Sequence, residues 1–218
     1  MKAAFFFAAL LAATVARGGI EAEGKSVNAI QLFNGKDLAG WRLFLAEGKS
    51  DPSAAKVGAD GVLHLESKLS GYLVTEKKFS DYRLHVEWRW AKDAVANSNS
   101  GVLIHLNPPD TIWPACFECQ LKTGNAGQFV GMGLDIPAAP TISNRKRAPR
   151  LADPSEKPLG EWNTYEIHAR GNTVEVFVNG VRQNFARDLP VSEGGIALQL
   201  EGFPIDFRNV WLAPLKKE

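Results

Sequence analysis

The chain has 218 residues, a formal net charge of +1, ten per cent aromatic residues and two cysteines. This length suits one domain with enough chain to bury a core. A charge so close to zero argues against nucleic acid or an anionic membrane as a general partner, because such partners need a basic stripe that neutralises their phosphates.

The first residues have the pattern of a secretory signal peptide. Lys2 precedes an apolar run from Ala3 to Ala16, which ends in small residues that suit signal-peptidase cleavage. The run is shorter than the roughly 20 residues that a membrane-spanning helix needs, and no cysteine lies just behind it for lipid attachment. We therefore expect a signal peptide over residues 1–19, a flexible leader over 20–30 and one folded domain over 31–218. The protein would be periplasmic or secreted, with no membrane span.

Alternation of apolar and polar residues recurs along the rest of the chain and predicts β-strands. The clearest strand is Tyr82–Trp90, and Tyr165–Arg170 and Val174–Val178 follow the same pattern before a predicted type I′ turn at Asn179-Gly180. Further strands are predicted at Val62–Glu66, Tyr72–Thr75, Val102–Leu106, Phe117–Leu121, Ile196–Leu200 and Ile205–Leu212. Many short strands separated by glycine and proline predict an all-β sandwich of two antiparallel sheets.

One long stretch shows little alternation. The segment from Gly124 to Leu159 is rich in glycine, proline, alanine and basic residues, and we interpret it as a loop that lies over a sheet, because such long loops within a domain are usually functional or mobile. It contains the densest basic run, Arg145, Lys146, Arg147 and Arg150. We interpret this run as a solvated surface.

The two cysteines form a CxxC pair at Cys116 and Cys119. A redox pair needs a helix N-terminus that lowers the thiol pKa, and a zinc site needs two further ligands at similar spacing. The sequence shows neither. On a strand, side chains three residues apart point to opposite faces, where the geometry for a disulfide is poor. We therefore predict two unlinked cysteines.

Several motifs, in order along nearly the whole mature chain, resemble the 3-keto-disaccharide hydrolase family. They are Leu32–Trp41, Asn99–Val102, Phe117–Leu121, Gly160–Tyr165, Gly195–Gly202 and Ile205–Val210. The resemblance implies a concanavalin A-like jelly-roll sandwich that acts on glycosides whose glucose unit carries a ketone at C3. It also implies that a separate sugar 3-oxidoreductase supplies this carbohydrate substrate. No cofactor is expected, although scattered Asp and Asn residues leave a structural calcium ion open.

Strand parity indicates which side chains point away from the core. Phe117, Cys119 and Leu121 form an apolar row, so the residues between them face the other way. The same argument applies to the last two predicted strands. We hypothesise that these polar side chains converge on one concave sheet face and that a histidine joins them. The set is Glu118, Gln120, Gln199, Glu201, Arg208 and His105.

A ketone at C3 acidifies the proton on C2, so a carboxylate can remove it, the C1 substituent can leave, and water can add to the product. The hypothesis makes Glu118 the base and gives Arg208 the task of stabilising the oxyanion or a neighbouring carboxylate. Glu201 or His105 would be the acid. For binding, Gln120 and Gln199 would contact sugar hydroxyls, and the loop residue Trp113 would stack on a sugar ring.

Simpler interpretations of the same residues stay open. Glu118 could be a solvated strand carboxylate, Arg208 part of a structural ion pair, and His105 a surface histidine. The rival function is a non-catalytic carbohydrate-binding module that uses the same face. A third is an interaction domain of a cell-surface complex, which a flat apolar patch would indicate. Many relatives carry an Asp-His or Ser-Glu pair where this chain has Leu200-Glu201, so a histidine-based role has no residue here.

Overall fold

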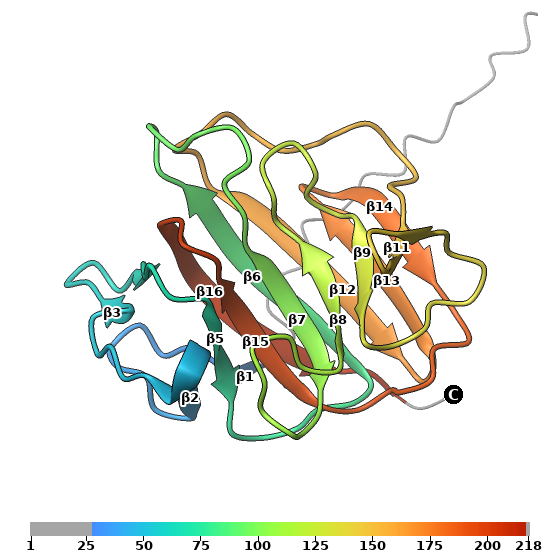
Figure 1. The fold of residues 1–218 in the computed structure, drawn as a ribbon, viewed down its shortest axis with the longest axis horizontal. Helices are drawn as coiled ribbons and strands as arrows, with labels where there is room; N and C mark the ends of the chain where they lie inside the picture. The colour runs from blue at the N-terminus through green and yellow to red at the C-terminus, as the bar shows by residue number, and fades with distance from the viewer. Residues whose placement is uncertain (1–27, 217–218) are drawn as a thin grey trace, which may run out of the picture.

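In the computed structural model, which describes residues 28–216, two antiparallel sheets of eight strands each stack face to face (Figure 1). The predicted all-β sandwich is confirmed. The predicted signal peptide and nearly all of the leader lie outside the described residues. Within residues 28–216, no helix is long and apolar enough to cross a membrane, and the one helical element is a short 3-10 turn, η1 (Ala46–Gly48).

We name the two sheets after a central strand of each. The β6 sheet has the order β14 (Val181–Ala186), β13 (Thr173–Val178), β12 (Asn163–Arg170), β6 (Tyr82–Trp90), β16 (Ile205–Pro214), β4 (Leu63–Leu65) and β3 (Ala55–Val57), with β1 (Ile30–Gln31) also paired to β16. The β8 sheet has the order β10 (Thr141–Ile142), β11 (Arg145–Ala148), β9 (Phe129–Met132), β8 (Cys116–Gln120), β7 (Gly101–Leu106), β15 (Gly195–Leu200), β5 (Gly71–Thr75) and β2 (Trp41–Leu45).

The alternation in the sequence becomes alternation of burial in the β6 sheet. Along β6 every second side chain is buried and those between are half-buried, so one face of the strand packs on the core and the other meets water. The β12–β13–β14 meander follows as predicted. Asn179 and Gly180 both have positive φ, 49° and 80°, as a type I′ turn requires.

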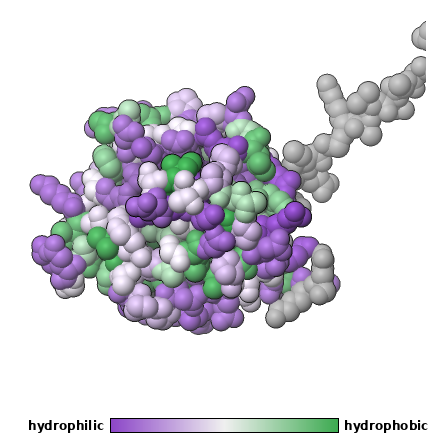
Figure 2. Space-filling view, turned by 45° about the vertical axis from the view of Figure 1, so that its right-hand side comes forward, coloured by the Kyte–Doolittle hydropathy of each residue, from purple (hydrophilic) through white to green (hydrophobic). Residues whose placement is uncertain are grey.

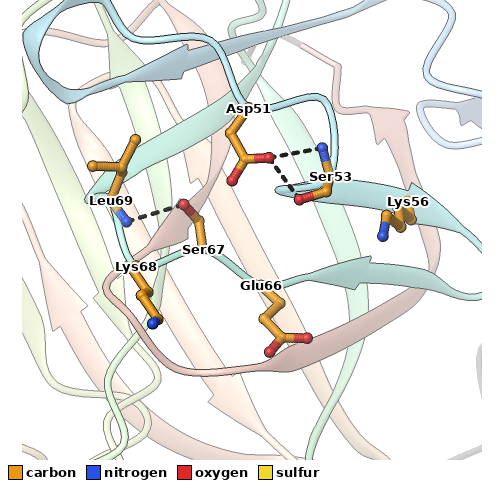
Figure 3. A pocket seen from close by; sticks show the side chains of 7 residues that line it. All are labelled: Asp51, Ser53, Lys56, Glu66, Ser67, Lys68 and Leu69. Carbon is orange, nitrogen blue, oxygen red and sulfur yellow. Dashed lines mark hydrogen bonds between the residues drawn. The ribbon is translucent and has the colours of Figure 1, made fainter.

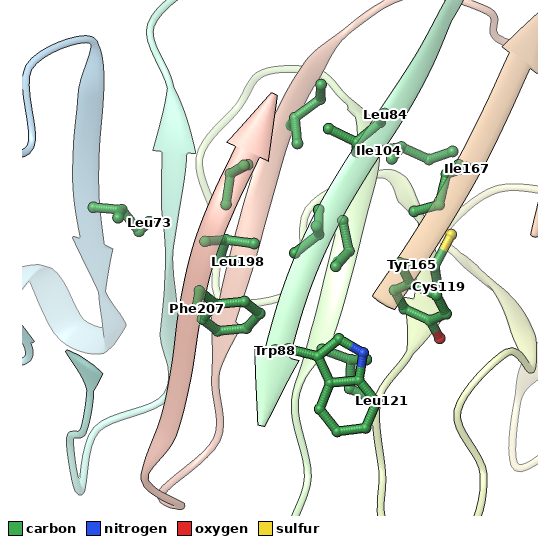
Figure 4. Packing of buried hydrophobic residues seen from close by; sticks show 14 of the residues in the cluster. Leu73, Leu84, Trp88, Ile104, Cys119, Leu121, Tyr165, Ile167, Leu198 and Phe207 are labelled. Atoms are coloured by element: carbon green, nitrogen blue, oxygen red, sulfur yellow. The ribbon is translucent and has the colours of Figure 1, made fainter. Parts of the chain in front are cut away.

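The core fills the space between the two sheets (Figure 4). Leu84 and Trp88 from the β6 sheet meet Ile104 and Leu198 from the β8 sheet, and all four are fully buried. Each such side chain contributes about 1.5–3 kcal/mol by leaving water. This packing fixes the β8 sheet in place, so the positions of side chains on its opposite, outer face follow from strand register alone.

The predicted single loop from Gly124 to Leu159 is wrong, because three strands lie inside it. All four residues of β9 are buried, so this strand shows no polar alternation. All four residues of the basic strand β11 are half-buried, and β11 pairs with β9 near one edge of the β8 sheet. A strand covered on both faces and a short basic strand both lack the pattern from which strands are predicted.

Both cysteines are free, as predicted, and both are buried. Cys119 belongs to the main core, whereas Cys116 points to the outer face of the β8 sheet, where its Sγ lies 3.8 Å from Sδ of Met132. Burial raises the pKa of both thiols, which makes them poor nucleophiles.

We therefore predict that neither thiol of the native protein reacts with a maleimide reagent, because both are protonated and out of contact with solvent. Two thiols should react once the protein is unfolded in denaturant, as counted by mass spectrometry. A mass about two daltons below that of the reduced chain, with no labelled thiol in denaturant, would instead reveal a disulfide.

Candidate active site

Strand register brings polar side chains together on the outer face of the β8 sheet. In β7, Gly101 lies opposite Gln120 of β8, and Leu103 lies opposite Glu118. On the other side of β7, Leu198 of β15 lies opposite Val102, so the next residue, Gln199, lies beside Gly101. The predicted convergence on this face is therefore found for Glu118, Gln120, Gln199 and, at the end of β15, Glu201.

Glu118 is a buried carboxyl group with a strongly shifted pKa. Its exposed fraction is 2 %. Burial and, second, the neighbouring Glu201 carboxylate raise the pKa of Glu118 to about 7, against the opposite effect of Arg145 and Arg147. Desolvation and a like charge both disfavour the ionised form of an acid. A carboxyl group with this pKa can both take up and release a proton near neutral pH.

Glu201 is held by two side-chain amides. Asn99 donates from Nδ2 to one carboxylate oxygen, and Gln199 donates from Nε2 to the other at 3.0 Å. Burial raises the pKa of Glu201, while the hydrogen bond from Asn99 and the charges of Arg145 and Lys122 act against it. The carbonyl oxygens of the same two amides, Oδ1 of Asn99 and Oε1 of Gln199, are buried and have no hydrogen-bond partner among the described residues.

A glycine makes room for these groups. A Cβ atom on Gly101 would lie 2.8 Å from Cγ and Oε1 of Glu118 and 3.2 Å from Oε1 of Gln199. These distances are shorter than van der Waals contact, so a side chain at this position would displace the two polar groups. Glycine inside a strand weakens it but allows a close approach of other groups. The glycine is therefore part of the site although it has no side chain.

Gln120 lies on the predicted face, but its amide oxygen is already used. Oε1 accepts hydrogen bonds from the backbone N–H groups of Leu121 and Lys122, at 3.0 and 2.8 Å. The side chain therefore holds the chain where it leaves β8, and its hydrogen bond also lowers the pKa of Glu118. Gln120 thus acts on Glu118 from within the protein, and its predicted contact with a sugar stays a prediction.

Two arginines that sequence analysis assigned to a solvated surface belong to this site. Arg145 and Arg147 lie two residues apart on β11, so their side chains share a face, and both are half-buried. Cζ of Arg145 lies 5.1 Å from the centre of the Trp113 ring, a cation–π contact that connects β11 with the loop between β7 and β8. Trp113 is 40 % exposed, and its ring is thus held at the edge of the site. The i, i+2 spacing of Arg145 and Arg147 was the signal that could have revealed them.

Beyond Glu118 the outer face of the β8 sheet becomes apolar. A second buried cluster consists of Tyr72, Val74, Leu103, Leu106, Cys116, Met132 and Ala197, with Phe44 packed against it. Phe44 stacks on Tyr72 at 5.0 Å. The β7–β8 loop is tied over this cluster by Asp110, which bonds Arg42 at 2.9 Å and accepts from the Tyr72 hydroxyl at 3.3 Å.

Arg208 does not join the site. It lies on β16, in the β6 sheet, where its Nε donates to Glu87 at 2.6 Å and its Cζ lies 4.0 Å from the Trp162 ring. Arg208 does face away from the core, as predicted. It lies on the outer face of the β6 sheet, however, whereas Glu118 lies on the outer face of the β8 sheet. Strand parity separates core from solvent and gives no information about which of two sheets a strand enters, so the predicted convergence of Arg208 with Glu118 is wrong.

His105 also lies elsewhere. It has a left-handed backbone, with φ of 53°, at the point where the pairing of β7 with β15 shifts register. The irregularity turns its ring into the core, 6.2 Å from Tyr82 and 6.1 Å from Phe117 between ring centres. Burial lowers the pKa of His105 to about 4. It is therefore neither a surface histidine nor a member of the predicted site, and it is neutral at pH 7.

A separate polar pocket of about 430 Å³ lies at the β3–β4 end of the sandwich (Figure 3). Some of its polar groups bond one another. Asp51 accepts from the N–H and hydroxyl of Ser53, at 2.9 and 2.6 Å, and Ser67 accepts from the N–H of Leu69 at 3.0 Å. No His, Cys, Asp or Glu group of three or more that could hold a metal ion occurs in the described part of the chain.

The side of the molecule seen in Figure 2 carries hydrophilic side chains over most of its area, with small apolar areas between them. Fold and site together define the class: a concanavalin A-like jelly roll with a group of buried carboxyl and amide side chains on one sheet face.

Comparison with solved structures agrees with this class. A proposed glycosyl hydrolase from Parabacteroides distasonis ATCC 8503 is 23 % identical, with a TM-score of 0.62 over 87 % of this chain and 94 % of that chain. The Bacillus licheniformis β-glucanase is 12 % identical, with a TM-score of 0.60 over 88 % and 100 %. The carbohydrate-binding module CBM66 from Bacillus subtilis is 11 % identical, with a TM-score of 0.53 over 78 % and 93 %. At these identities the likeness shows a shared fold.

The chain belongs to the 3-keto-alpha-glucoside-1,2-lyase-like domain family, whose model matches residues 28–213. The resemblance in the sequence motifs is thereby confirmed. No curated relative matches the chain. Family membership places the protein among those with carbohydrate-related activity or binding.

Substitution of Gly101 tests the packing around Glu118. In Gly101→Ala, we expect the added methyl group to push the Glu118 carboxyl toward solvent, so its pKa should fall from about 7 toward the ordinary 4.5. A carboxyl ¹³C NMR titration measures this. The matched control is Gly195→Ala in β15, whose Cβ would meet a methyl group of Val74 at 3.1 Å. Equal Glu118 pKa values in wild type and Gly101→Ala would contradict the packing described.

A pair of arginine substitutions tests the relocation of Arg208. Arg147→Met should raise the Glu118 pKa, because a positive charge that favours the carboxylate is lost. Arg208→Met should leave that pKa unchanged and lower the free energy of unfolding by about 1 kcal/mol or less, since its ion pair with Glu87 is partly exposed. NMR titration and denaturant unfolding measure the two effects. A shifted Glu118 pKa in Arg208→Met would place Arg208 back at the site.

Proposed function

We propose that this protein cleaves 3-keto-glycosides by elimination followed by hydration, with Glu118 as the base that removes the C2 proton. The observation that supports this most is the burial of Glu118 beside a second carboxyl group, with a pKa of about 7. A base is most effective when its pKa lies near the working pH. The family match supplies the substrate class.

In the first step the C2–H bond breaks, the proton goes to Glu118, and the electron pair forms an enolate with its charge on the C3 oxygen. Arg145 and Arg147 are the cations nearest to this chemistry, and we assign them the stabilisation of the enolate that sequence analysis gave to Arg208. An arginine is always charged, and a preorganised positive charge in a water-poor site is worth more than in water.

In the second step the enolate electrons form a C1=C2 double bond, the C3 ketone returns, and the C1–O bond breaks. The leaving oxygen needs a proton, which we assign to Glu201, because burial raises its pKa. Water then adds at C1 and C2 regains a proton, which gives net hydrolysis. The exposed Trp113 would stack on the departing group. The substrate needs prior oxidation at C3 by a separate oxidoreductase.

The second candidate is a non-catalytic carbohydrate-binding module. The exposed ring of Trp113 favours it, since aromatic platforms are the usual means of holding a sugar. A binding module, however, has no use for a carboxyl group that is buried at a cost and kept near neutral pKa. Perturbed carboxyl groups in a polar site are a sign of catalysis, so we rank this candidate second.

The decisive experiment uses a 3-keto-glucoside with a chromogenic leaving group. Wild type should release the chromophore, and Glu118→Gln should lower kcat/KM by about 100-fold or more, because the amide cannot accept the C2 proton. Glu156→Gln is the matched control: Glu156 is a half-buried carboxyl group that also has a raised pKa, bonded to backbone N–H groups of Gly124 and Ala126, and its substitution should preserve the rate. Release at equal rates by wild type and Glu118→Gln would overturn the assignment.

The pH dependence of the rate shows whether Glu118 acts in its ionised form, as a base must. Only ionised Glu118 is a base, so for a nitrophenyl substrate, whose leaving oxygen departs without a proton, kcat/KM should rise with pH through about 7 and then level off. Glu201→Gln should move that rise to lower pH, since the like charge that raises the Glu118 pKa is gone. The folded protein binds the Glu118 proton more tightly than the unfolded chain does, so stability falls as pH rises from about 4.5 to 7. Glu118→Gln should therefore melt higher than wild type above pH 7, which also shows that it folds.

A further inference from the structure

We infer that Asn99 and Gln199 form a site that recognises two free hydroxyl groups of the substrate through their buried carbonyl oxygens, an inference that rests on the proposed function. Oε1 of Gln199 and Oδ1 of Asn99 are both buried without a hydrogen-bond partner, and the exposed fraction of Gln199 is 1 %. Buried polar atoms in folded proteins nearly always have a partner. What distinguishes these two atoms from other unpartnered buried atoms is that both amides bond the same carboxyl group of the candidate site, Glu201, which points to a ligand that donates to them there.

The orientation of both amides is fixed by Glu201. Nε2 of Gln199 and Nδ2 of Asn99 each donate to a Glu201 oxygen. While Glu201 is ionised, as it is before substrate binds, a rotation that exchanged nitrogen for oxygen would turn a carbonyl oxygen toward a carboxylate oxygen, and both are acceptors. The two free positions are therefore acceptors, and only a donor can pair with them.

This requirement selects the chemistry of the bound group. A hydroxyl group donates a hydrogen bond, whereas a ketone, an ether, a carboxylate and a phosphate only accept. Methylation, acylation or glycosidic substitution of a hydroxyl removes the donor. The Asn99–Gln199 site therefore fits a sugar unit whose hydroxyls near the reacting carbons are unsubstituted, as in the terminal unit of a glycoside.

The order of the strands in the β8 sheet indicates how the sugar ring is oriented across the site. Gln199 lies on β15, Glu118 on β8, and Arg145 and Arg147 on β11, and β8 stands between the other two strands in the sheet. One side of Glu118 thus offers acceptors and the other side offers guanidinium donors. The C3 oxygen should point to the arginines and the free hydroxyls to Asn99 and Gln199, with the C2 proton at Glu118 between them.

The test compares a nitrophenyl 3-keto-glucoside with analogues in which the C4 or C6 hydroxyl is replaced by hydrogen or by fluorine. Wild type should lose about 100-fold or more in kcat/KM for at least one position, because the analogue leaves a buried acceptor unpaired. At that position the fluorinated analogue should have as low a kcat/KM as the deoxy analogue, since fluorine does not donate a hydrogen bond.

The variant Gln199→Met separates recognition from structure. In this variant the parent compound and the sensitive deoxy analogue should be cleaved with equal kcat/KM, so the preference for the parent compound is lost. A merely structural role would slow both compounds equally and preserve their ratio. The matched control is Gln183→Met. Gln183 is another fully buried glutamine with an unpartnered Oε1, but it lies on β14 of the other sheet and donates to Asp153 and Ser155. It should retain the full discrimination.

A binding experiment distinguishes failure of this inference from failure of the proposed function. Unoxidised methyl glucoside and its C4 and C6 deoxy analogues are titrated by calorimetry or NMR. Cleavage of keto-glucosides with equal rates for parent and analogues would overturn the inference and leave the function standing. No cleavage, with binding of methyl glucoside that is lost on deoxygenation and in Gln199→Met, would support the inference and overturn the function. Neither cleavage nor binding would overturn both.

Discussion

Desolvation of the Glu118 carboxyl group is the physical constraint on which the rest of the site depends. The carboxyl lies against a sheet face whose neighbouring side chains are apolar, and a glycine at position 101 leaves the space for it. In such a place the charged form is disfavoured. The arginines of β11 then matter because they limit how far the pKa rises, and keep Glu118 within reach of ionisation near pH 7.

The outer face of the β6 sheet shows what a similar set of charges does when its members are paired. Burial raises the pKa of Glu87, but hydrogen bonds from Asn209 and Arg208 outweigh it and leave the pKa below the ordinary value. Glu166 behaves in the same way through His85 and Arg83. These carboxylates are ionised and held, as structural ion pairs are. On the β8 sheet Glu118 and Glu201 instead have raised pKa values, and this difference singles out the β8 sheet as the chemical face.

Much of this arrangement could be predicted from the sequence, for reasons that also define the limit of such prediction. Alternation gave the strands of the β6 sheet and, with the apolar row at 117, 119 and 121, the outward direction of Glu118. Parity could not assign Arg208 to a sheet, because side-chain direction is a local property and sheet membership depends on long-range pairing. His105 was assigned to the wrong face because a register shift reverses parity, and β11 was missed because it is short and basic.

Burial of Glu118 implies that the site lowers the free energy of unfolding of the protein. At pH 7 the protein would gain from replacing this carboxyl with a neutral group of the same shape, because a buried charge is costly even with the hydrogen bond from Gln120. The two unpartnered acceptors at Asn99 and Gln199 act in the same direction. Under the proposed function both costs are removed by one event, in which a polyhydroxylated ligand supplies donors to the amide oxygens and a proton to the carboxylate. The features that destabilise the free protein are therefore the ones that favour a bound sugar.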